Sequence, residues 1–155
     1  MILERLKGER FSRVLPLWMD YTAVLIGGGP SVTPEDVERV RVAREADAVR
    51  VIAINDSYLL APWADLHYAA DAKWHRWHQE GVAKPMLDLT AEQVREKWAT
   101  FPGTRCSIQG VEEYVPDTVH LLRNAAWPYH SLGLSLDPGS LVTGRHGGFQ
   151  ALNLA

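Results

Sequence analysis

Three short apolar runs, at 22–28, 48–54 and 64–70, punctuate the first half of the chain. Each is seven residues long and consists mostly of branched or small apolar side chains, which is typical of strands covered on both faces of a sheet. Each run ends in glycines or in short polar residues. The pattern therefore predicts three buried strands whose carboxyl ends carry polar or glycine-rich turns.

Helical patterns lie between and after these runs. Thr33 predicts an N-cap, with Pro34 at the first helical position and acidic residues in the first turn. The apolar stripe of this helix is predicted to be buried and consists of Val37, Val40, Ala43 and Ala46. A further helix is predicted over 89–101, where Thr90 and Gln93 have the spacing of a capping box.

The second half of the chain continues the alternation. Strands are predicted at 104–110 and 117–124, a loop at 127–143, and a glycine-rich turn at 143–148 that opens a final helix. Alternating strands and helices favour an α/β fold with a mainly parallel sheet. With 155 residues, 46% of them hydrophobic, the chain is predicted to form one domain over residues 1–155.

The amino-acid composition limits the kinds of partner that the chain is expected to bind. The 16 basic and 19 acidic residues give a net charge of -3, which provides no overall attraction to nucleic acid or to an anionic membrane. No stretch approaches the ~18 consecutive apolar residues of a membrane span. The single cysteine, Cys106, excludes an internal disulfide and any multi-cysteine zinc site. We therefore expect a cytoplasmic protein without a membrane or nucleic-acid partner.

A glycine-rich stretch joins the first predicted strand to the first predicted helix. Glycines allow the backbone to approach an anion closely, the N–H groups of the helix's first turn would point at it, and the Ser31 hydroxyl can donate a further hydrogen bond. The stretch is neither a G-x-G-x-x-G motif nor a Walker A loop, and a tight turn without a ligand is the alternative. The predicted phosphate loop consists of Gly27, Gly28, Gly29, Pro30 and Ser31.

Asn55, Asp56 and Asp71 follow the second and third predicted strands. In open α/β sheets ligands bind beyond the carboxyl ends of the strands, near the point where strand order reverses. There, these side chains could hold ribose hydroxyls, a base edge or a metal ion. Asn and Asp are also common helix caps and turn formers, so each residue alone also fits a purely structural role.

Three segments together resemble a known family. "VLIGGGPSV" (24–32), "VIAINDSYLLAPWADLHYAAD" (51–71) and "TGRHGGFQALNLA" (143–155) are similar to motifs of the hydroxymethylpterin pyrophosphokinase-like family of bacterial and phage proteins. That family is structurally similar to bacterial sialyltransferases that use CMP-activated sugars. The resemblance implies a Rossmann-like, three-layer domain that holds a nucleotide or nucleotide sugar, with the glycine loop on the phosphates, Asn55 as a nucleotide contact and Asp71 at the rim.

The last segment departs from the family motif. Where the family often has Asn-Ser-Gly, this chain has Arg145-His146-Gly147-Gly148. The glycines, Gly147 among them, still suit a backbone anion site, and Arg145 could pair with phosphate. His146 is the candidate general base, because it adjoins this loop.

These observations favour a nucleotide-dependent transferase, with glycosyl transfer as the leading hypothesis. One alternative is a pyrophosphokinase-like enzyme that uses ATP and a divalent metal such as Mg²⁺, with Asp56 and Asp71 as metal ligands. Another is a nucleotide-binding module without turnover. His75 and His78, three residues apart, could form a metal pair, but without a third ligand the spacing is more typical of surface or half-buried residues. No metal site is predicted, and His67, inside an apolar run, is expected in the core.

The predicted final helix has only about seven residues before Ala155, shorter than the ~11 that are typical. In the families that the chain resembles, a further strand and polar loops follow this helix. We therefore expect a truncated or minimal form with an exposed sheet edge, covered by a second copy of the chain in a homo-oligomer. Transfer activity is expected to be weak.

Overall fold

The computed structural model describes residues 3–5, 7–125, 135, 137–142, 147–152 and 154–155. Its centre is a six-stranded sheet in which every neighbouring pair of strands is parallel. The strands follow one another in sequence order across the sheet: β3 (Thr22–Ile26), β4 (Val49–Ile54), β5 (Leu66–Tyr68), β6 (Thr104–Ile108), β7 (His120–Asn124) and β8 (Ser140–Leu141).

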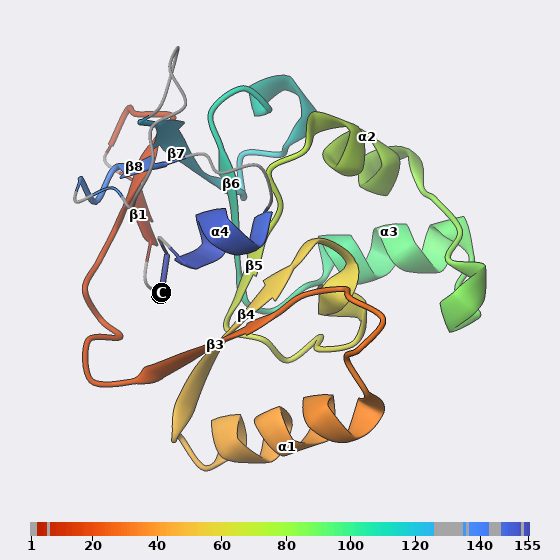
Figure 1. Cartoon of the computed structure of the whole chain (residues 1–155). Coiled ribbons are helices and arrows are strands. Elements are labelled where there is room, and N and C mark those ends of the chain that lie inside the picture. The colour runs from red at the N-terminus through yellow and green to blue at the C-terminus, as the bar shows by residue number, and fades with distance from the viewer. Residues whose placement is uncertain (1–2, 6, 126–134, 136, 143–146, 153) are drawn as a thin grey trace.

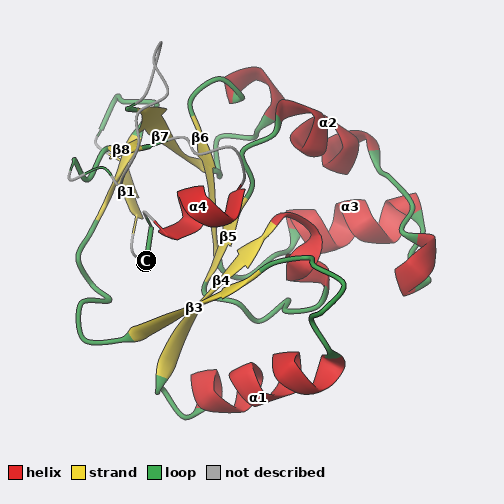
Figure 2. Cartoon of the chain, in the orientation of Figure 1, coloured by secondary structure: helices red, strands yellow, loops and turns green. Residues whose placement is uncertain are grey.

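Helices cover both faces of this sheet (Figure 1). Right-handed crossovers between strands in sequence order bring the connecting helices to one face: α1 (Pro34–Glu45), α2 (Ala72–Glu80) and α3 (Ala91–Ala99). Helix α4 (Gly147–Leu152) lies against the other face, as does part of the antiparallel hairpin of β1 (Leu3–Arg5) and β2 (Ser12–Val14) (Figure 2). Three-residue 3₁₀ turns lie at Pro85–Leu87 and Glu112–Tyr114, and a longer one at Asn55–Leu59.

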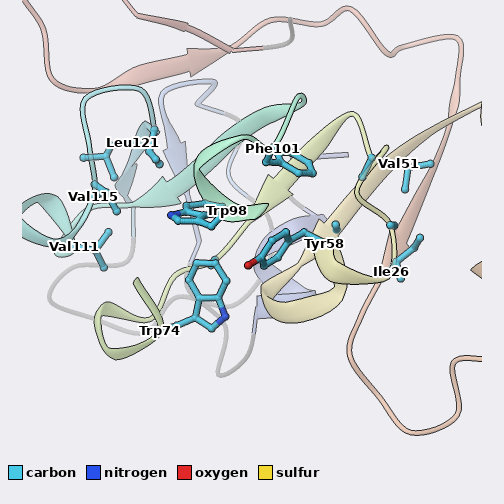
Figure 3. Packing of buried hydrophobic residues seen from close by; sticks show 14 residues of the cluster. Ile26, Val51, Tyr58, Trp74, Trp98, Phe101, Val111, Val115 and Leu121 are labelled. Carbon is cyan, nitrogen blue, oxygen red and sulfur yellow. The ribbon is translucent and has the colours of Figure 1, made fainter. Parts of the chain in front are cut away.

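Two apolar cores flank the sheet, and alternation along β4 builds both. Val51 and Ala53 pack toward the α1–α3 layer, while Ile52 and Ile54 pack toward α4. The first core is rich in aromatic rings, and Figure 3 shows Tyr58, Trp74, Trp98 and Phe101 gathered within it. The chain therefore has the expected Rossmann-like three-layer α/β fold with a parallel sheet.

Both predicted capping boxes are present, at Thr33 and Asp36 in α1 and at Thr90 and Gln93 in α3. The predicted apolar stripe of α1 is only half-buried, and Ala46 is exposed as the C-cap, because α1 covers the edge of the sheet rather than its centre.

The expectation of a loop throughout 127–143 was wrong at its end. Ser140 and Leu141 pair with Arg123 and Asn124 to form β8. A two-residue strand carries too little periodicity for a sequence pattern to reveal it.

The two edges of the sheet differ. At the far edge, β7 is covered by β8 and by an isolated bridge between Leu121 and Phe11, which precedes β2. At the near edge, β3 pairs with β4 alone among the described strands, and its residues Ala23, Val24 and Leu25 stay half-buried. Within the described residues, no helix is long and apolar enough to cross a membrane.

Candidate functional site

The carboxyl edge of the sheet brings several of the predicted site residues together. Because β3, β4 and β5 are parallel neighbours, the residues that follow them share one edge. Gly27 and Asn55 follow strands that are ~4.8 Å apart, and Asp71 follows the next strand along. The strand order does not reverse among the described strands, so the crevice that such a reversal creates is not present. Any site here must be formed by the loops.

The glycine loop after β3 does not need glycine for its own conformation. Its three glycines all lie outside the left-handed φ region. A Cβ built at Gly27 or Gly28 would meet nothing within 4 Å, and one at Gly29 would meet only the Ser31 Oγ, at 3.8 Å. By contrast, a Cβ at Gly103 would lie 2.4 Å from the Ala64 carbonyl oxygen. The loop thus leaves open the space that side chains would otherwise fill.

Two N–H groups at the start of α1 are engaged within the protein, contrary to the expectation that they would face a ligand. The Thr33 N–H donates to the Asp36 carboxylate at 3.2 Å, and the Asp36 N–H donates to the Thr33 Oγ at 3.2 Å. The hydrogen bond from the Thr33 hydroxyl lowers the pKa of Asp36, so this turn also carries negative charge. Within the described part of the chain, no hydrogen bond engages the amides of Gly28, Gly29 or Ser31.

Asn55 and Gly147 lie against one another, although 92 positions separate them in the sequence. A Cβ at Gly147 would be 3.2 Å from Ile54 Cγ2 and 3.9 Å from Asn55 Nδ2. Asn55 has φ 52°, in the left-handed region that Asn tolerates better than most residues. Its carbonyl accepts a hydrogen bond from His67 Nε2 at 2.9 Å, and its side chain is exposed. Arg145 and His146, which precede Gly147, lie outside the described residues.

Asp56 is engaged by neighbouring side chains of the protein, although its own side chain stays 40% exposed. Its carboxylate accepts hydrogen bonds from the Trp74 indole, at 2.9 Å, and from the Lys84 ammonium. His78 Nε2 lies 3.4 Å away. Burial raises the pKa of Asp56, but the contacts with His78, Lys84 and Trp74 outweigh it and hold that pKa well below its usual value. These contacts occupy both carboxylate oxygens.

Asp71 caps α2. Its Oδ1 accepts hydrogen bonds from the backbone N–H groups of Lys73, at 2.7 Å, and Trp74, at 3.3 Å, while the residue stays exposed. The structural alternative considered for these acidic residues therefore accounts for the contacts of both Asp56 and Asp71.

Three histidines are buried in the aromatic core. His67 was expected there, but the expectation that His75 and His78 would be surface or half-buried residues was wrong, since they are 1% and 0% exposed. Each ring hydrogen-bonds a carbonyl oxygen at 2.9 Å, on Asn55, Ala69 and Trp74 respectively. Burial lowers the pKa of His67 to about 3 and that of His75 to about 4.

The helical spacing of α2 explains this burial. Trp74, His75 and His78 form one inward stripe, and the rings of Trp74 and His78 stack with centroids 3.6 Å apart. The described residues contain no group of three metal-ligating side chains. The burial and carbonyl contacts of the three histidines are those of core residues.

Comparisons with protein-family models, with curated proteins and with solved structures find no match for this chain. The resemblance to the hydroxymethylpterin pyrophosphokinase-like family therefore stays a prediction.

Proposed function

We propose that this protein binds a nucleotide or nucleotide sugar at the carboxyl edge of its sheet, with the phosphate group on the glycine loop. The observation that carries this proposal is the open space at Gly27 and Gly28, where neither the backbone conformation nor packing requires glycine. Glycine without a structural need fits a loop that a ligand approaches at backbone distance.

The donors for the phosphate are backbone amides and one hydroxyl. The amides of Gly28, Gly29 and Ser31 supply N–H groups, and the Ser31 side chain supplies an O–H. The side-chain amide of Asn55, which directly follows the adjacent strand β4, hydrogen-bonds the base or ribose. Arg145 adds the positive charge that the first turn of α1 lacks.

Among the candidate chemistries, the contacts of Asp56 favour metal-independent transfer. A pyrophosphokinase needs carboxylates that are free to bind a divalent metal, whereas Asp56 is held by Lys84 and Trp74. We therefore propose a glycosyltransferase-like domain with His146 as the general base. A binding module without turnover is the alternative, and product formation distinguishes the two.

Thermal unfolding with a panel of ligands tests the proposal. CMP, UDP, ADP, GTP and CMP- or UDP-sugars are added to the wild-type chain, with and without Mg²⁺. A ligand that binds only the folded state raises the melting temperature by mass action. We expect at least one nucleotide to do so without Mg²⁺, and Gly28→Ala to abolish this rise. Stabilisation that requires Mg²⁺ would favour the pyrophosphokinase alternative, and no stabilisation by any ligand would overturn the proposal.

The same proposal includes the setting in which the protein works. We propose a cytoplasmic homo-oligomer in which a second copy covers the β3 edge. The unpaired side of β3 and the half-buried apolar residues Val24 and Leu25 support this arrangement. A nucleic-acid partner is not proposed, because the net charge is -3.

A further inference from the structure

A cavity of about 910 Å³ lies at the amino edge of the sheet, opposite the glycine loop. Its walls include the first residues of three parallel strands, the carboxyl end of α1 and the loop before β5. A five-residue strand rises ~3.3 Å per residue, so the two edges are separated by roughly 17 Å. The cavity is therefore distinct from the proposed nucleotide site, and its volume is typical of small-molecule pockets, which span about 300–1,000 Å³.

Arginines neutralise the carboxylates of this cavity. Asp65 pairs with Arg44 at 2.9 Å and also accepts the Val51 N–H. Asp47 pairs with Arg50 at 2.7 Å. The third carboxylate, Glu45, pairs with Arg41 of the same helix.

Arg105 is a cationic lining residue for which no carboxylate partner is found within the described part of the chain. Its guanidinium donates to the Trp98 carbonyl oxygen at 3.2 Å and to Thr118 Oγ1 at 2.8 Å. Two of its five N–H groups are thereby used. The side chain is half-buried, and this burial lowers its pKa. A partly desolvated charge without a counter-ion is costly.

Contacts that stabilise the fold account for only some of the N–H groups of Arg105. The bond to Trp98 places a positive charge at the carboxyl end of α3, which is favourable for the helix dipole. The guanidinium also lies over the Trp98 ring, 5.1 Å from its centroid, in a cation–π contact. The bonds to Trp98 and Thr118 together leave three of its N–H groups, and its own positive charge has no anionic partner among the described residues. A bound anion would accept hydrogen bonds from these N–H groups and would balance the positive charge.

The rest of the lining includes three aromatic side chains among smaller and polar residues. Trp18, Trp63 and Phe101 line the cavity, and Phe101 belongs to the aromatic core in Figure 3. Aromatic faces favour a planar apolar group, and a guanidinium fork matches the two oxygens of a carboxylate. We propose that this cavity binds a small aromatic carboxylate, with Arg105 on the carboxylate and Trp63 against the ring.

A pair of probes that differ only in charge tests the proposal. 2-Naphthoate and its neutral amide, 2-naphthamide, are titrated into the ¹⁵N-labelled chain, and the signals of the Arg105 Nε–H and the Trp63 indole N–H are followed by NMR. We expect 2-naphthoate to shift both signals and to bind about tenfold or more tightly than the amide, as a charge-assisted bond predicts. Equal affinities, or shifts elsewhere, would overturn the proposal without any variant.

Two variants test whether Arg105 supplies the positive charge that binds 2-naphthoate. Arg105→Gln keeps N–H donors for Trp98 and Thr118 but removes the charge, so 2-naphthoate should bind about tenfold more weakly while 2-naphthamide is unaffected. Arg39→Gln removes the same charge from an exposed position on α1 and should change neither affinity. Undiminished binding of 2-naphthoate to Arg105→Gln would contradict the assignment.

Discussion

The surroundings of Gly28 and Gly103 differ in whether they leave room for a side chain. The first lies in open space, whereas the second is confined by the Ala64 and Asp65 carbonyl oxygens at 2.4 and 2.8 Å from its would-be Cβ. The sequence pointed to the loop at Gly28 because it joins a strand to a helix. It could not reveal that position 103 requires glycine, because the carbonyl oxygens that leave no room for a Cβ there belong to residues almost forty positions away in the sequence.

Alanine substitutions at these two positions should change the free energy of unfolding differently. Gly103→Ala should lower the free energy of unfolding by about 1–3 kcal/mol, the usual cost of overpacking. Gly28→Ala should leave it unchanged or raise it by up to ~1 kcal/mol, because the unfolded chain loses freedom. Urea unfolding followed by circular dichroism measures both. A large loss for Gly28→Ala would mean that the loop is glycine-rich for structural reasons.

The buried histidines make stability depend on pH. In the unfolded chain their pKa is near 6.5, whereas in the fold burial lowers that of His67 to about 3 and that of His75 to about 4. Between these values the unfolded state binds protons that the folded state does not. Stability should therefore be complete above about pH 6.5 and fall as the pH drops, by up to ~1.4 kcal/mol per pH unit for each group.

Unfolding at about pH 7.5 and pH 5 measures this loss. Asp36 and Asp56 have lowered pKa values, so their stabilisation is lost only below the ordinary value of 3.8 and leaves this window unaffected. His75→Gln, which keeps an N–H donor for Ala69, should make the dependence shallower. A free energy of unfolding that is equal at both pH values would show that these rings are protonated in the fold.

At the scale of elements, local sequence patterns predicted well where helices begin. They predicted poorly which side chains of a helix are buried. The capping boxes of α1 and α3 depend on residues three apart, so the sequence contains the whole signal. The burial of His75 and His78 depends on carbonyl partners and on stacking against Trp74. A polar residue in a helical stripe can be buried once its N–H has such a partner, and the sequence alone does not display the partner.

Removing either cap should cost about 1 kcal/mol of stability. Thr33→Ala and Thr90→Ala each remove a hydroxyl that accepts a backbone N–H of the first helical turn. Thr100→Ala is the matched control, since Thr100 is exposed at the end of α3 and bonds only the Glu96 carbonyl through its side chain. Thermal unfolding of the three variants should show a smaller effect for the control. Equal losses in all three would indicate a general effect of losing a threonine hydroxyl.

At the scale of the whole molecule, alternation of elements predicted the α/β class and the parallel sheet. It did not predict that β3 to β8 follow one another without a reversal, because periodicity identifies elements and not their order. The residues that follow β3, β4 and β5 still share one edge of the sheet, because these strands are parallel neighbours. What the sequence could not reveal is that Asp56, two residues after Ile54, is bound by the side chains of Lys84 and Trp74.

The open side of β3 leads to a prediction about assembly. An edge strand with no partner on its outer side among the described residues, and with half-buried apolar residues, is a surface that a second copy can cover. Multi-angle light scattering over a range of concentrations should give a mass above the 17.4 kDa of one chain. A mass of one chain at the highest concentration would refute the homo-oligomer.

NMR mapping of a nucleotide tests the central claim most directly. The nucleotide that stabilises the chain most is titrated into the ¹⁵N-labelled protein, and each backbone amide is followed. We predict that the largest shifts fall on Gly28, Gly29, Ser31 and Asn55, and that they vanish in a folded Gly28→Ala variant. Shifts concentrated at Arg105 and the amino-edge cavity instead, or the same shifts in Gly28→Ala, would contradict it.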